Sequence, residues 1–259
     1  LLLLPETPKI VINSVSVLLT IYSVSKGIET VARAGEIYFF GTILAYIAFT
    51  IFLLFSDVVN IDNLFPMFEV GFLKIIKAAI PLFLIFPFGE LVVFLSLLHY
   101  TEREKGTIKA CVLAIMSGAF ILLIFNIFNI TTIGPYLIEN TPFPTLKTIR
   151  LIKVQDFIQR LDSLAVLIFL TSTFFKLKIF YFAIASGLRD IFGTKKYTGF
   201  LFPAAITAAI ASMLFADNYT YFIYFVKNYL PLVALNFELV IPIILLIIIL
   251  YKKYIKKSQ

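Results

Sequence analysis

The stretch AAIPLFLIFPFGEL, residues 78–91, contains two prolines, one glycine and one carboxylate in otherwise apolar sequence. Pro87 has no backbone N–H and its ring clashes with the preceding helical turn. Gly89 can adopt dihedral angles that other residues avoid. We therefore expect the helix that contains this stretch to unwind between Phe86 and Glu90. The alternative is a simple proline kink, with Glu90 in a packed interface.

The composition places this helix in a membrane. Of the 259 residues, 61% are hydrophobic and 14% are charged, and the mean hydropathy is +1.00, whereas soluble domains carry about 25% charged residues. The uncharged windows 37–56, 110–138 and 197–216 each reach the roughly 20 residues that cross a bilayer as a helix. They are apolar on every face, which excludes a β-barrel of alternating segments. The prediction is an all-α, polytopic transmembrane helical bundle.

We expect about seven spans in a single integral-membrane domain over residues 1–259. Their predicted ranges are 9–27, 37–55, 72–98, 108–128, 151–175, 197–215 and 229–251. A further apolar run, 179–192, has basic residues at both ends and is too short to span. It either continues the fifth span or forms a helix along the inner membrane surface.

The basic residues predict the orientation. When lysines and arginines are assigned to alternating sides of the spans, they divide fourteen against seven, and the richer side should be cytoplasmic. The loop 57–71 has three carboxylates and no base, so it should lie outside. This places the C-terminus in the cytoplasm and Leu1 outside, which an odd number of missing N-terminal spans would explain. Since orientation accounts for the net charge of +7, we expect no nucleic-acid partner.

No sequence pattern points to catalysis or to a cofactor. A single cysteine, Cys111, and a single histidine, His99, cannot supply the usual nitrogen and sulfur ligands of a zinc site. The sequence contains no HExxH motif, phosphate-binding loop or pair of nucleophile and base. We expect no enzyme activity, no cofactor and no metal site.

Charged residues inside apolar spans are costly in lipid, so each needs a structural or functional reason. Asp156 and Arg160 are four residues apart and can pair on one helix face. Arg160 either reads a ligand carboxylate or ties two helices together, with Ser163 on the same face; alternatively, the pair only snorkels outward. Glu238 is the only charge between residues 228 and 251, and it should face the protein interior.

Other polar residues favour helix packing or helix ends. Glu29 and Arg33 are four apart at the end of the first span, where a solvated helix end is the main interpretation. Small and polar stripes of the kind that pack helices closely run through two spans. They are Asn13, Ser16, Thr20, Ser23 and Gly27 in the first, and Ala204, Ala208 and Ser212 in the sixth.

These features together define the expected site. The candidate substrate-binding residues are Phe86, Pro87, Gly89, Glu90, Arg160 and Ser163. The candidates for a structural or coupling role are Glu29, Arg33, Asp156 and Glu238.

Five landmarks in this order resemble the endospore germination permease family, the integral-membrane B subunit of nutrient germinant receptors, within the amino acid, polyamine and organocation permease superfamily. They are LPETP at 4–8, GIE at 27–29 with Ala32-Arg33, FPFGE at 86–90, QRLD at 159–162, and the Pro242 span with its lysine tail. The resemblance covers essentially all 259 residues.

The resemblance implies a leucine-transporter-like fold of ten helices in two inverted five-helix repeats, of which this chain would lack the first three. Segment 72–98 would then be the broken sixth helix, and segment 151–175 would be the eighth helix, lining the same cavity.

The implied function is that of a spore germination protein. In the family, the B subunit recognises a small nutrient, commonly an amino acid, in the spore inner membrane and acts with A and C subunits to trigger germination. The alternative is an amino-acid permease, a secondary transporter of the same superfamily. A third hypothesis is that the protein is a membrane scaffold that binds no ligand.

Overall fold

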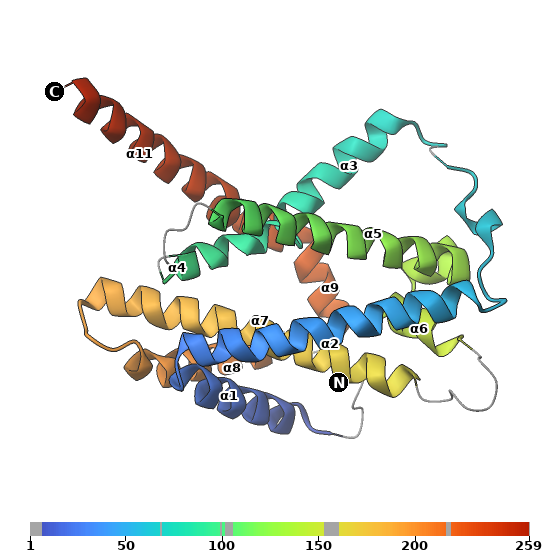
Figure 1. Ribbon diagram of the computed structural model, residues 1–259, viewed down its shortest axis with the longest axis horizontal. Coiled ribbons are helices and arrows are strands. Elements are labelled where there is room, and N and C mark those ends of the chain that lie inside the picture. Colours follow the sequence, from blue (N-terminus) through green and yellow to red (C-terminus); the bar gives the residue numbers. More distant parts are fainter. Residues whose placement is uncertain are drawn as a thin grey trace. The chain divides into compact units, whose positions relative to one another are not determined.

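The regular structure is helical throughout the part of the chain that the computed structural model describes (Figure 1). The described residues are 7–67, 69–98, 100–101, 106–152, 161–215 and 219–258. The predicted all-α class is confirmed. The chain folds as two compact units, the first made of residues 1–5, 22–67 and 101–178, and the second of residues 6–21, 68–100 and 179–259.

Five helical segments among the described residues are long and apolar enough to cross a membrane. They are Ile28–Leu54, Phe72–Leu98, Thr107–Glu139, Leu161–Phe192 and Leu230–Ile255. Two shorter apolar helices are α1 (Lys9–Ser25) and α8 (Thr198–Phe215). With these two as spans, the total would be the predicted seven, which stays a prediction.

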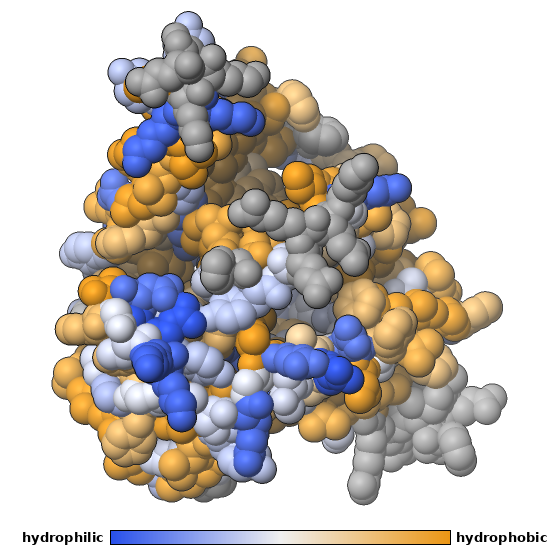
Figure 2. Space-filling view, turned by 60° about the vertical axis from the view of Figure 1, so that its left-hand side comes forward, coloured by the Kyte–Doolittle hydropathy of each residue, from blue (hydrophilic) through white to orange (hydrophobic). Residues whose placement is uncertain are grey.

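The surface of the chain also fits a lipid environment. Large apolar side chains are widely exposed, for example Phe40 at 68% and Ile108 at 79%. Much of the face shown in Figure 2 is apolar, around a group of hydrophilic residues. A soluble monomer rarely exposes contiguous apolar surface on this scale. The structure therefore describes an integral membrane protein.

Two helices run beyond the predicted spans. Helix α2 (Ile28–Leu54) starts directly after Gly27, whose φ of 102° is open to glycine. It begins nine residues before the predicted span because charged side chains limit entry into lipid and do not interrupt helical hydrogen bonds. Helix α5 (Thr107–Glu139) also continues past residue 128 and bends where Gly134 precedes Pro135.

Helix α7 (Leu161–Phe192) is continuous over 32 residues. The run 179–192 therefore continues the fifth segment and is not a separate surface helix. Residues 153–160, which include the start of the predicted fifth span, lie outside the described residues.

The core of the first unit forms where α2, α5, α7 and the short helix α6 (Pro144–Arg150) converge. Its most deeply buried apolar side chains include Phe49 and Leu53 of α2 and Ile149 of α6. A polar group lies within this region as well. The side-chain amide of Asn129, on α5, donates to the Thr145 hydroxyl at 3.0 Å, and its carbonyl accepts from Thr148 at 2.9 Å.

Tyr38 joins α2 to α7 in the first unit. Its hydroxyl donates to the carbonyl oxygen of Ile168 at 2.8 Å and is also hydrogen-bonded to Ser172. Its ring stacks on Phe175 with centroids 4.9 Å apart. These contacts set the rotation of α7 about its axis relative to α2.

In the second unit, the two predicted stripes meet. The Asn13 side chain on α1 donates to the hydroxyl of Ser212 on α8 at 2.9 Å. Thr20 is fully buried and donates to the Ser16 carbonyl oxygen at 2.7 Å. This agrees with the packing role predicted for the small and polar residues of α1 and α8.

Asn129→Ala should lower the free energy of unfolding by about 1–3 kcal/mol, because the fully buried Thr148 hydroxyl would lose its acceptor. A denaturant titration in mixed micelles measures the change. Asn126→Ala is the matched control on the same helix, since Asn126 is exposed and bonds only the Leu122 carbonyl oxygen. Equal effects of the two substitutions would show that the buried network does not stabilise the unit.

Candidate binding site at a helix break

Helix α3 (Phe72–Ile85) ends inside the apolar stretch 72–98, as the sequence predicts. Phe86 adopts an extended backbone with φ of −133° and ψ of 130°, because a following proline disfavours the helical region. The Phe86–Pro87 peptide bond is cis. The chain then resumes as the 3₁₀-helix η2 (Gly89–Phe94) and the short helix α4 (Leu95–Leu98). The predicted unwinding between Phe86 and Glu90 is confirmed.

A second irregular segment packs against this break. Helix α10 (Leu230–Leu235) leads into a π-helical turn, η3 (Asn236–Val240), and then into α11 (Ile241–Ser258). Pro242 cannot donate a hydrogen bond to the carbonyl oxygen of Glu238, and a widened turn before the proline relieves the clash with that oxygen. Segment η3 contacts both η2 and α3, and α10 contacts α3.

Gly89 is the point of closest approach between the two irregular segments. A Cβ atom built on Gly89 would collide with the Glu238 carboxylate oxygen Oε2 and with the Leu84 carbonyl oxygen, and would lie 3.1 Å from Cδ of Glu238. Only glycine therefore allows the Glu238 carboxylate to reach the break. Oε2 of Glu238 is buried, which agrees with the prediction that this side chain faces the interior.

Glu90 adds a second carboxylate to the break. It is half-buried and follows Gly89 directly at the start of η2. Pro87 also leaves the Phe83 carbonyl oxygen without the amide four residues later that would bond it in an α-helix. Carboxylates and carbonyl oxygens all accept hydrogen bonds, so this arrangement is suited to a positively charged group such as an ammonium ion.

The positions of Arg160, Ser163 and the coupling candidate Asp156 relative to the break stay predictions. Arg160 and Asp156 lie outside the described residues. Ser163 belongs to the first unit, whereas the break belongs to the second. Its backbone amide donates to Asp162 Oδ1 at 2.8 Å. A shared pocket for Arg160, Ser163 and the break stays a prediction.

Glu29 and Arg33 form the predicted pair at the start of α2. Arg33 Nη2 lies 2.8 Å from Glu29 Oε1, and the two side chains are 76% and 78% exposed. This geometry fits a solvated helix end. A coupling role for the pair stays a prediction.

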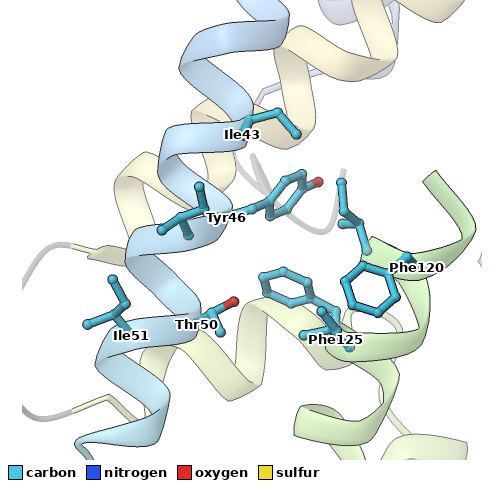
Figure 3. A pocket seen from close by; sticks show the side chains of 9 residues that line it. Ile43, Tyr46, Thr50, Ile51, Phe120 and Phe125 are labelled. Atoms are coloured by element: carbon cyan, nitrogen blue, oxygen red, sulfur yellow. The ribbon is translucent and has the colours of Figure 1, made fainter. Parts of the chain in front are cut away.

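Sequence reasoning missed an apolar recess of about 260 Å³ between α2 and α5. The rings of Phe120 and Phe125 on α5 face Tyr46 and Thr50 on α2 (Figure 3). The side-chain hydroxyls of Tyr46 and Thr50 are the polar side-chain groups in its lining. No residue pattern marks such a recess, because its lining has the composition of any packed or lipid-facing helix. It offers no charge to a charged nutrient, so the break is the better candidate site.

The chain is similar to spore germination proteins. A family model described as "Spore germination protein" matches residues 1–220. Spore germination protein KB of Bacillus subtilis (strain 168) is 28% identical over 249 residues, covering 96% of this chain and 67% of the relative. Putative spore germination protein YfkT of the same strain is 25% identical, with the same coverage. Spore germination protein XB of Bacillus anthracis is 25% identical over 72% of this chain and 51% of the relative. No solved structure matches the chain.

Gly89→Ala should destabilise the second unit by about 1–3 kcal/mol, because the new methyl group overpacks the contact with Glu238 and Leu84. Thermal unfolding in detergent measures the loss. Gly118→Ala is the matched control, since a Cβ there meets nothing within 4 Å. In a Glu238→Ala background the penalty of Gly89→Ala should shrink, because one of its two collisions is gone. An unchanged penalty would argue against the close approach.

Proposed function

Because the chain belongs to the spore germination protein family, we propose that it is the membrane subunit of a nutrient germinant receptor that recognises a small nutrient, such as an amino acid. The observation that supports recognition is the helix break at Phe86–Glu90, against which the buried Glu238 carboxylate packs. Broken helices within a membrane are places where freed backbone groups and charged side chains bind solutes. The family context makes the bound solute a signal for germination.

Recognition at the break rests on charge. The ammonium group of an amino acid would donate hydrogen bonds to the Glu90 and Glu238 carboxylates and to the Phe83 carbonyl oxygen, which loses its helical donor at Pro87. Because α3 ends at Ile85, the angle between α3 and the following helices η2 and α4 can change without breaking regular helical hydrogen bonds. A nutrient that binds one arrangement better than the other shifts the population toward it. That shift is the signal that the A and C subunits would receive in the spore inner membrane.

The finer architecture is part of the same proposal. Seven spans would form helices four to ten of a leucine-transporter-like fold with two inverted repeats. The four lysines after Leu250 would hold the C-terminus on the cytoplasmic side. The five long apolar segments, one of which is the broken segment 72–98, support this arrangement.

An amino-acid permease activity is the second candidate, and the same observation favours it. A helix break with carboxylates beside it serves a transporter as well as it serves a sensor. The two functions differ in whether the solute crosses the membrane, so a flux measurement distinguishes them.

Glu90→Gln or Glu238→Gln should weaken the response to the nutrient about tenfold to a hundredfold, because each substitution removes a charge-assisted hydrogen bond of about 1.5–3 kcal/mol. The measurement is the nutrient concentration that gives half-maximal germination of spores carrying each variant, with the twenty standard amino acids as the panel. Binding to the purified chain is followed separately by the rise in Tm that an amino acid causes.

Glu36→Gln is the matched control, because Glu36 is an exposed glutamate on α2 of the other unit. It should leave both the germination response and the rise in Tm unchanged. If all three glutamate variants respond like the wild type, the break is not the recognition site.

The chain reconstituted in liposomes with its A and C partners should show no accumulation of the radiolabelled amino acid that triggers germination. Counterflow that is abolished by Glu238→Gln would instead favour the permease over the sensor.

A further inference from the structure

A second cavity, of about 340 Å³, lies in the first unit where the end of α1 and the start of α2 meet α7. Two lysines line it, Lys26 from the α1–α2 junction and Lys178 from α7. The hydroxyl residues Ser23 and Thr30 also line it, and no lining residue is acidic. This lining is rich in hydrogen-bond donors and carries two positive charges.

Lys178 is the unusual member of the cavity, because its side chain is buried, with 6% exposed. Its ammonium group lies 4.1 Å from the ring centroids of both Phe174 and Phe175. No carboxylate of the described residues forms an ion pair with it. Ring faces stabilise a cation but accept no conventional hydrogen bond, so the three donors of this ammonium group favour an anion in the cavity.

The position of Lys178 is fixed by the packing of α7 on α2. Phe175 stacks on Tyr38, and Tyr38 donates to the Ile168 carbonyl oxygen. Phe175 also lies in ordinary contact range of a Cβ at Gly35. The lysine is therefore held toward the cavity before any ligand arrives, which lowers the entropic cost of binding.

Lys26, at the junction of α1 and α2, supplies the second charge of the cavity. It is exposed, and its ammonium group lies 5.1 Å from the ring centroid of Tyr22. Thr30 donates its hydroxyl to the Lys26 carbonyl oxygen at 3.2 Å. The nearest acidic side chain in the sequence, Glu29, is held in the exposed pair with Arg33 and does not line the cavity.

We propose that this cavity binds the phosphate group of an anionic membrane lipid. It lies where α1 ends and α2 begins, and Lys178 reaches it from the middle of α7. Basic pockets between membrane helices bind anionic headgroups. The walls also include Val31 and Ala34, and Ile37, one turn further along α2, is 78% exposed. The acyl chains of a lipid can follow this apolar surface, whereas free phosphate gains nothing from it.

The test uses the full chain, purified and stripped of lipid, and measures binding of phosphatidylglycerol against phosphatidylcholine by native mass spectrometry. Phosphatidylglycerol should bind preferentially. Lys178→Gln and Lys26→Gln should each weaken its binding about fivefold, the effect of one lysine near an anionic surface. Lys195→Gln, at an exposed lysine after α7, is the matched control and should change nothing.

Three results would overturn the proposal. The first is equal binding of the two lipids, and the second is unchanged phosphatidylglycerol binding in Lys178→Gln. The third is that inorganic phosphate binds alone and displaces the lipid when in excess, which would indicate a site for soluble phosphate. Lys178→Arg keeps the charge and should retain binding. If Lys178→Gln does not fold, the comparison of phosphatidylglycerol binding between Lys26→Gln, where it should weaken, and Lys195→Gln, where it should not, still decides the outcome.

Discussion

The second unit depends on one constraint, which is that backbone groups in lipid need hydrogen-bond partners within the protein. Pro87 and Pro242 each remove a backbone donor from a long apolar segment. The first ends α3 at Ile85, and the second is preceded by the π-turn at 236–240. These irregular segments pack against each other. Two defects that would each be costly alone are therefore located together.

Gly89 allows the Glu238 carboxylate to reach the break. Any side chain at position 89 would occupy the space of the Glu238 carboxylate. The absence of a Cβ atom therefore lets a charged group from a distant part of the chain enter the break. A carboxylate in an apolar span is retained only where it has a structural or functional use. Here its position near the Leu84 carbonyl oxygen, at the point of closest approach to Gly89, suits the recognition of a positively charged group.

The first unit presents the opposite charge by different means. Lys178 is buried between two phenylalanine rings, and the hydrogen bonds of Tyr38 hold its helix in place. The acidic break needs an interrupted transmembrane segment, whereas the basic cavity is formed by a junction between two helices and by aromatic rings on a third. Each unit thus combines an apolar exterior with a small number of charges in defined surroundings.

Composition and local residue chemistry alone determined the class of this protein. Uninterrupted apolar windows require helices in lipid, and proline before glycine at 87–89 favours a break over a simple kink, because both effects act within a few residues. The sequence also predicted the packing role of the small and polar stripes of α1 and α8, since the spacing within each stripe places its residues on one helix face.

Only the tertiary structure decided which groups meet. The sequence marked Glu238 as buried but could not identify Gly89, some 150 residues earlier, as its neighbour. It also left Lys178 among the basic residues at the ends of the run 179–192. The rings that bury it and the second lysine of the cavity come together only through the packing of α1, α2 and α7. Contacts between distant segments depend on how apolar faces pack, and many packings satisfy the same apolar pattern.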